Sequence, residues 1–440
     1  MVAAGAGATA LAVGTVPALA GAPAVQTGTQ AGRRYRAYVK FSRDAPSVVQ
    51  LTARALRGRE IAVRPEAAQT CYTSVGQAVL PTDSAPERAL IMGHGGVGVV
   101  EAVGPQVIRA QVGDRVLLNF HSQCGSCFNC LWMRGDRCLN RGDADDPPVA
   151  TMQNGTPVYH NRGSMAELIM LPEEYAVPLF TDLSSVELSM LACVGNAGLG
   201  MAMTKCPVEA GSSVVVFGAG PTGLSAVEGA RVKGASQIIA VEPIRYRREL
   251  ALKLGATIVV DPNQYARRVR KPGDVPRQQD LYEDALIDHL RELCKPKTPR
   301  RWAGGGTVGP DHVIEAVGGD YVPPKVERGP DPTGVTVLQQ CWDLCSAIGS
   351  IVTCGVGQPI GDMVQIRAQQ WADGAKHHWP GTAGGTNPRR DNPRYVKMME
   401  TGQINMKALA SATYPLDKAR EAYQVAGDRT VVATVVLPNG

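Results

Sequence analysis

Four cysteines stand close together in the chain, at the spacing C-x2-C-x2-C-x7-C. They are Cys124, Cys127, Cys130 and Cys138. Four thiolates on one short loop can surround a zinc ion tetrahedrally, and a site filled in this way has no position left for water. Two disulfides would be the alternative in an exported protein, but Cys-x-x-Cys pairs this dense suit two bridges poorly. The spacing therefore predicts a structural zinc ion.

A glycine-rich turn forms the second motif. Gly218, Gly220 and Gly223 make up G-x-G-x-x-G, with Pro221 and Thr222 between the last two glycines. The first glycine permits a tight turn, the second lets the backbone approach a pyrophosphate, and the third lets a helix pack on the sheet. Because the following helix begins at this turn, its N-terminus would face the phosphates. The motif predicts a dinucleotide site, and a strand–turn–helix without a ligand is the alternative.

An acidic residue ends the next strand pattern. Glu242 stands nineteen residues after Gly223, where a carboxylate can bind the ribose hydroxyls of adenosine and repel a 2′-phosphate. This favours NAD over NADP. Arg247, together with Arg245 and Arg248, follows closely and could soften that preference.

The elements around the glycine turn alternate between strand and helix patterns. SSVVVF, QIIAVEP and TIVVDP read as strands, separated by the helix patterns LSAVEGARVKGA and RYRRELALKLGA. This βαβαβ order predicts a doubly wound parallel sheet in an α/β protein. The segments before residue 119 and after residue 360 read as β-rich or irregular. We therefore expect a leader at 1–32, a catalytic domain at 33–197, a nucleotide-binding domain at 198–358 and a return to the catalytic domain at 359–440.

Composition excludes several classes of protein. The 440 residues are 44% hydrophobic and 19% charged, with a formal net charge of +5, which excludes a disordered polyelectrolyte and does not indicate a nucleic-acid partner. No run of eighteen strongly apolar residues follows the first two dozen, so we expect no membrane span. Residues 2–22 are uncharged and weakly apolar, with Ala-Leu-Ala near their end, as in signal peptides of the twin-arginine type. They predict export of a folded protein, and a disordered cytoplasmic tail is the alternative.

Three segments together carry a resemblance to a known family. The stretch GHGGVGVVEAVG, the four-cysteine lobe and VVVFGAGPTGLSA resemble the zinc-dependent medium-chain alcohol dehydrogenases, from about residue 35 to the C-terminus. The resemblance implies a GroES-like catalytic domain split by a Rossmann domain. It also implies a second, catalytic zinc ion held by Cys71, His94 and Cys193, with Thr73 taking the proton of the alcohol. NAD, a small-molecule alcohol or aldehyde, and a homodimer or homotetramer follow from the same resemblance.

The chain departs from that family near the implied catalytic zinc. Gly95 stands where a glutamate usually follows the histidine, and Ser74 stands where an aspartate is usual. Such acids orient metal ligands, so their loss should leave the zinc more electropositive or less tightly bound. Gly76 replaces the histidine that ends the proton relay in some relatives.

Long insertions suggest a narrower resemblance. The stretches 263–309 and 321–335, and the segment around His377 and His378, resemble the branch containing glutathione-independent formaldehyde dehydrogenase, whose members can hold NAD tightly. Two other readings stay open: a catalytically silent protein that binds zinc and nucleotide, and a zinc-free reductase of the same superfamily.

Overall fold

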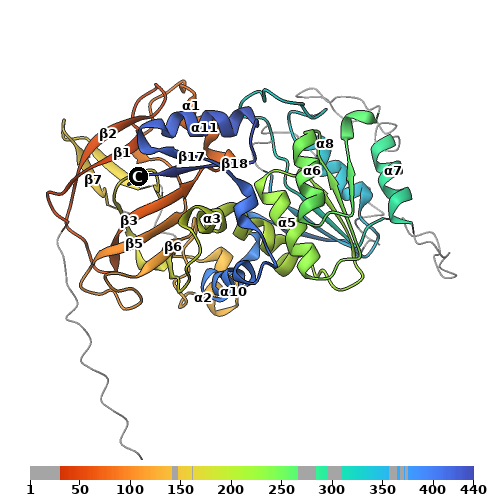
Figure 1. Cartoon of the computed structure of the whole chain (residues 1–440), viewed down its shortest axis with the longest axis horizontal. Coiled ribbons are helices and arrows are strands. Elements are labelled where there is room, and N and C mark those ends of the chain that lie inside the picture. Colours follow the sequence, from red (N-terminus) through yellow and green to blue (C-terminus); the bar gives the residue numbers. More distant parts are fainter. Residues whose placement is uncertain are drawn as a thin grey trace, which may run out of the picture.

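The computed structural model describes residues 30–140, 147–160, 162–265, 284–295, 309–355, 364–366, 371 and 375–440. The leader expected at 1–32 lies almost wholly outside these residues, as does much of the insertion at 263–309. The described chain forms two lobes side by side, one β-rich and one built on a parallel sheet (Figure 1).

The β-rich lobe contains a small barrel and a larger sheet. The barrel strands follow the order β1 (Arg34–Lys40), β2 (Ser47–Ala53), β7 (Ala150–Met152), β8 (Pro157–His160) and β4 (Ala89–Ile91). The larger sheet has the order β10 (Ala176–Pro178), β6 (Arg115–Leu118), β5 (Gly96–Val103), β3 (Glu60–Gln69), β18 (Ala433–Leu437) and β17 (Ala410–Pro415), with β9 (Ile169–Pro172) paired to β3. Since β18 pairs with β3, the C-terminal segment completes the N-terminal domain.

Helices of the same C-terminal segment cover this lobe. Helix α11 (Ala419–Asp428) packs beside α1 (Val75–Val79), and both lie along one side of the lobe (Figure 1). Asn387, directly before helix α10 (Pro388–Glu400), donates from Nδ2 to the carbonyl oxygen of Met133, just after the short helix α2 (Phe128–Leu131), at 2.9 Å. The β-rich domain is therefore formed by two separate segments of the chain that fold together, as the sequence predicts.

The second lobe is a six-stranded parallel sheet. Its order is β13 (Ile258–Val260), β12 (Gln237–Val241), β11 (Ser213–Phe217), β14 (His312–Glu315), β15 (Ser350–Thr353) and β16 (His377–Pro380). The connecting helices are α5 (Pro221–Val232), α6 (Arg245–Leu254), α7 (Ala285–Cys294) and α8 (Val335–Leu344). The inner strands are almost continuously apolar because both faces of a parallel sheet are covered by helices. The predicted α/β class and doubly wound sheet are confirmed.

The predicted domain boundaries need correction at two places. Strand β16 pairs with β15 and so belongs to the parallel sheet, although it lies beyond the boundary placed at residue 358. Its sequence is only His-His-Trp-Pro and all four residues are exposed, so no buried apolar run marks it as a strand. The boundary at 197 falls inside one continuous helical segment, Ser185–Lys205, which links the two lobes.

That segment is also the longest apolar helix among the described residues. It consists of α3 (Ser185–Met190), a π-helical turn η4 (Leu191–Gly195), α4 (Asn196–Gly200) and a second π-helical turn η5 (Met201–Lys205). By length and composition alone it could cross a bilayer, yet 83% of its most apolar 18-residue stretch is buried inside the protein. This burial is what a core helix of a folded domain requires.

Candidate functional site

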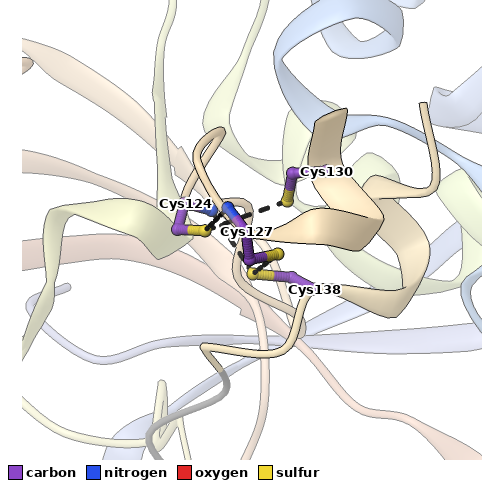
Figure 2. Close-up of side chains that lie close together, drawn as sticks. All are labelled: Cys124, Cys127, Cys130 and Cys138. Carbon is purple, nitrogen blue, oxygen red and sulfur yellow. Dashed lines mark hydrogen bonds between the residues drawn. The ribbon is translucent and has the colours of Figure 1, made fainter. Parts of the chain in front are cut away.

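The four cysteines of the predicted structural site converge on one point. Their sulfur atoms face one another around a small loop (Figure 2). The Sγ atoms of Cys124 and Cys130 are 4.0 Å apart, and those of Cys127 and Cys138 are also 4.0 Å apart. Four sulfurs around zinc at about 2.3 Å must lie about 3.8 Å from one another. The cluster therefore fits a tetrahedral zinc ion.

Backbone groups of the loop also favour thiolates. The N–H groups of Cys127 and Leu139 point at the sulfurs of Cys124 and Cys127, at 3.3 and 3.4 Å. Burial raises the pKa of the Cys124 thiol, but hydrogen bonds from the N–H groups of Ser126 and Cys127, together with side-chain contacts of Ser126 and Cys138, lower this pKa to about 6. Hydrogen bonds to thiolate sulfur stabilise the ionised form that binds a metal.

A second cluster joins three residues that are distant in sequence. Cys71 follows β3, His94 lies between β4 and β5, and Cys193 lies in the π-helical turn η4. Nε2 of His94 is 3.3 Å from Sγ of Cys193, which is 3.9 Å from Sγ of Cys71. All three ligand atoms lie within 4.8 Å of one another, so they fit a zinc ion with one position left open. π-helical turns occur often at functional sites, and this one aims Cys193 at its partners.

The thiols of Cys71 and Cys193 shift each other's pKa in opposite directions. The Cys193 thiol hydrogen-bonds to Cys71 and His94 lies nearby, so the pKa of Cys71 falls well below its ordinary value. The same contact with Cys71, together with burial, raises the pKa of Cys193. Oγ1 of Thr73 is 3.1 Å from Sγ of Cys71, which places its hydroxyl at the edge of the cluster.

The two departures from the family pattern have structural counterparts. Gly95 has a φ of +95°, and a Cβ atom there would lie 3.0 Å from Cβ of Ala192. A glutamate at this position would thus be strained and crowded against the turn that carries Cys193. Ser74 faces the metal cluster from the other side, with Oγ 3.4 Å from Nδ1 of His94. A hydroxyl therefore orients the imidazole.

One cavity connects this cluster to the glycine turn. It has a volume of about 590 Å³ and is lined by Cys71, Thr73, His94 and Cys193 on one side and by Gly218, Gly220, Pro221, Thr222, Glu242 and Arg247 on the other. Gly223 lies outside the lining, because it packs α5 against the turn: a Cβ atom on it would sit 1.8 Å from the carbonyl oxygen of Gly218. The structure thus brings the predicted metal and nucleotide residues together around one cleft.

The carboxylate of Glu242 is fixed by the backbone. It accepts hydrogen bonds from the N–H groups of Ala219, at 2.7 Å, and Ile244, at 3.0 Å. Arg247 is buried beside the second glycine, where a Cβ atom on Gly220 would lie 3.7 Å from its Nη1. An acid and a base therefore stand on the nucleotide side of the cleft, with the acid held in one orientation.

Sequence reasoning missed a group of residues in the lining of the cleft. Nη2 of Arg429 donates to the hydroxyl of Tyr72 at 2.7 Å and to the carboxylate of Asp320 at 2.5 Å. The ring of Tyr321 lies against that of Tyr72, with centroids 5.6 Å apart. Tyr72 adjoins Cys71 in sequence and could have been noticed. Arg429 ends a helix far along the chain, and no local pattern indicates its position.

Comparison with known proteins agrees with this geometry. The family model for the alcohol dehydrogenase GroES-like domain matches residues 57–181, and that for the zinc-binding dehydrogenase matches residues 221–328. S-(hydroxymethyl)glutathione dehydrogenase of Haemophilus influenzae is 27% identical over 414 residues, which cover 91% of this chain and 96% of that protein. The enzyme of the same name from Escherichia coli is 26% identical and is covered to 99%.

Solved structures show the same fold. An alcohol dehydrogenase zinc-binding domain protein from Burkholderia ambifaria superposes with a TM-score of 0.73 at 25% identity, covering 92% of this chain and all of that one. Benzyl alcohol dehydrogenase from Acinetobacter calcoaceticus gives a TM-score of 0.71 at 24% identity, with 92% and 99% covered. The two domain matches, the split fold and the two thiol clusters lead to one conclusion: this chain belongs to the zinc-dependent medium-chain alcohol dehydrogenase family of oxidoreductases.

Proposed function

We propose that the protein is an NAD-dependent dehydrogenase that interconverts a small alcohol and its aldehyde at a zinc site. The observation that carries this proposal is the shared cavity, since the open-sided ligand cluster and the glycine turn line one cleft of about 590 Å³. A zinc ion there supplies Lewis-acid chemistry, and a bound nicotinamide dinucleotide supplies a hydride acceptor.

The chain's own residues then have separate roles. Cys71, His94 and Cys193 hold the metal. Thr73 has its hydroxyl 3.1 Å from the Cys71 sulfur, so it stands where it can accept the proton of a substrate hydroxyl. Since Gly76 carries no side chain to continue a relay, we expect that proton to leave through water or the cofactor ribose.

Glu242 supports the choice of NAD. Its carboxylate is buried and held by two backbone N–H groups, so it cannot turn away from a 2′-phosphate. Repulsion between these two anions would discriminate against NADP. The nearby Arg247 is directed at the second glycine and at the carbonyl of Val431, which suits a role near the pyrophosphate.

Contacts across the cleft support slow exchange of the cofactor. Segment 320–325, which follows β14 of the parallel sheet, reaches the β-rich lobe at several points. Asp320 pairs with Arg429, Lys325 pairs with Asp428 at 2.7 Å, and Val322 is buried in the core of that lobe. A dinucleotide lying beneath these contacts would leave only after they open.

The chain as purified, without added metal or nucleotide, provides the first test. Native and denaturing mass spectra should show two zinc ions and one NAD per subunit, and an alcohol and aldehyde panel should then show turnover. His94→Ala and Cys193→Ser should abolish turnover while one zinc ion stays bound in the four-cysteine lobe. One zinc ion and no nucleotide in the wild type would instead favour the silent binding protein, and wild-type rates in either variant would refute the site.

A further inference from the structure

A buried glutamine stands beside the cluster of Cys71, His94 and Cys193. Gln69 is the last residue of β3, and its side chain is 0% exposed. Neither Oε1 nor Nε2 of its amide has a hydrogen-bond partner among the described residues. Leaving a buried amide without partners costs free energy, so folded proteins rarely contain one. An unpaired amide at this position therefore requires a physical explanation.

The strand directs this amide toward the metal cluster. Side chains two positions apart on an extended strand share a face, and the chain is still extended at Cys71, with φ −103° and ψ 134°. Ala67 and Cys71 both lie in the apolar core that also contains Cys193, whereas Ala68 lies in a different core. Gln69 therefore faces the core in which the two thiols meet.

The amide acts on the sulfur of Cys193. Contact with Cys71 and burial raise the pKa of the Cys193 thiol, whereas the amide of Gln69 lowers it. The S–H group of Cys193 is directed at Cys71, with 3.9 Å between the two sulfur atoms. The Cys193 sulfur can therefore only accept from the amide, and the group that approaches it is the Nε2 amino group of Gln69.

Gln69 reaches the site from behind the cavity. The cavity that joins the metal cluster to the glycine turn is lined by Thr70 and Cys71, and Gln69 lies outside this lining. The backbone N–H group and the hydroxyl of Thr70 both donate to the carbonyl oxygen of Thr434 in β18, which fixes this end of β3. Gln69 can thus influence a substrate only through the ligand that it contacts, and it is a positioning residue.

We infer that Gln69 donates from Nε2 to the Cys193 thiolate when that sulfur binds a metal, which holds the ligand in place and draws negative charge from it. A thiolate is a stronger hydrogen-bond acceptor than a thiol, so ligation completes a contact that falls short of an ordinary hydrogen bond in this structure. The inference rests on the zinc site of the proposed function. It deepens that function, because a sulfur that donates less charge leaves zinc a stronger Lewis acid.

Gln69→Met and Gln69→Leu test this inference in the full-length protein, because both fill the space of the amide without supplying a donor. We expect a chelator to remove zinc from the cluster about 10-fold faster than in the wild type, while the zinc of the four-cysteine lobe is unaffected. Gln424→Met, on α11, is the matched control, since Nε2 of Gln424 donates to Asp428 at 2.8 Å instead of to a sulfur. It should release both zinc ions like the wild type.

Cobalt in place of zinc gives a readout that a packing role would not move. Charge transfer from thiolate to cobalt produces an absorption band in the near ultraviolet, and losing a hydrogen bond to the sulfur shifts this band to lower energy. Subtracting the spectrum of Cys193→Ser, which should keep only the lobe metal, isolates the band of the cluster. We expect that band at longer wavelength in both Gln69 variants than in the wild type and Gln424→Met.

Circular dichroism and the content of lobe zinc show whether the variants fold. If both folded Gln69 variants keep the wild-type release rate and band position, the amide plays no part at the cluster and the inference is wrong. Faster release with an unmoved band would assign Gln69 to packing alone and would also overturn it. A wild type that binds no metal at the cluster would overturn the proposed function as well, whereas the first two results leave that function standing.

Discussion

The hydroxyl oxygen of Ser74 lies 3.4 Å from Nδ1 of His94, while the other ring nitrogen, Nε2, faces the sulfur of Cys193. The imidazole is therefore held between a neutral hydroxyl and a thiol. A carboxylate in the place of Ser74 would make the histidine a stronger electron donor to a metal, whereas a hydroxyl only fixes its orientation. The cluster of Cys71, His94 and Cys193 thus holds its imidazole by orientation, without a carboxylate that would add negative charge.

Removing that hydroxyl should loosen the metal at this cluster. In Ser74→Ala the imidazole loses its partner, and we expect zinc to leave the cluster about 10-fold faster under a chelator. Ser74→Asp should slow the loss, because the carboxylate strengthens the histidine as a ligand. A colorimetric chelator assay follows both zinc populations, and the lobe zinc is an internal control. Ser74→Thr keeps the hydroxyl and should behave like the wild type, and equal release rates in all four proteins would contradict the assignment.

Much of this site could be predicted from local sequence. The four cysteines lie on one loop, so their spacing alone places them together. The glycine turn and Glu242 lie on adjacent parallel strands, and the carboxyl ends of such strands meet at one edge of the sheet. The pairing of β11 with β12 brings these residues together as expected.

The other features of the fold and of the site could not be predicted from local sequence, because they depend on packing between distant segments. Cys71, His94 and Cys193 come from three separate elements, and only the resemblance to a family joined them before the structure did. Strand β16 was missed because its short, exposed sequence His-His-Trp-Pro lacks the apolar run that marks inner strands. The contact of Arg429 with Asp320 spans 109 positions and depends on how the two lobes meet.

Cofactor choice should depend on Glu242. Replacing it by glutamine removes the negative charge that faces a 2′-phosphate and keeps the length of the side chain, although the amide NH2 group gives up one of the two hydrogen bonds from the N–H groups of Ala219 and Ile244. We expect the ratio of kcat/KM for NADP to that for NAD to rise about 10-fold to 100-fold, since the lost repulsion amounts to about 1.4–2.7 kcal/mol. Steady-state kinetics with both cofactors measures this ratio. Glu249→Gln, on the exposed side of α6, should leave the ratio unchanged, and an unchanged ratio in Glu242→Gln would show that the acid does not face the adenosine ribose.

A buried carboxylate joins two strands at the edge of the cleft. Glu315 ends β14, and its two oxygens accept hydrogen bonds from four backbone N–H groups, at 2.7 to 3.2 Å. The donors are Val317, Gly318, Cys354 and Gly355. The carboxylate thereby fixes the segments that follow β14 and β15.

Glutamine at this position should destabilise the fold. In Glu315→Gln an amide NH2 group replaces one oxygen and faces N–H donors, so two hydrogen bonds to a buried charge are lost. We expect the free energy of unfolding to fall by about 2–4 kcal/mol and the Tm to fall by several degrees. A thermal unfolding experiment measures both changes. Glu292→Gln, at an exposed position of α7, should melt within about a degree of the wild type. A Glu315→Gln variant that melts like that control would show that the N–H groups find other acceptors.

The stability of the protein should fall with rising pH through Glu228. This glutamate of α5 is almost fully buried; one oxygen accepts the N–H group of Asn405 at 2.7 Å, and the other has no partner among the described residues. Burial raises its pKa from 4.5 to about 7. Because the folded state binds the proton more tightly than the unfolded state, the stabilisation is complete below pH 4.5 and is lost as the pH rises through 7.

Glu228→Gln isolates this effect, since glutamine keeps the shape and does not ionise. The variant should exceed the wild type in free energy of unfolding by about 2–3 kcal/mol at pH 8 and nearly match it at pH 5. Urea unfolding at pH 5, 6, 7 and 8 measures the difference, and comparing the two proteins at each pH cancels the titration of all other groups. Glu209→Gln, at an exposed site, should follow the wild type throughout. A constant difference between wild type and Glu228→Gln across this range would mean that Glu228 is already ionised in the folded protein at pH 5.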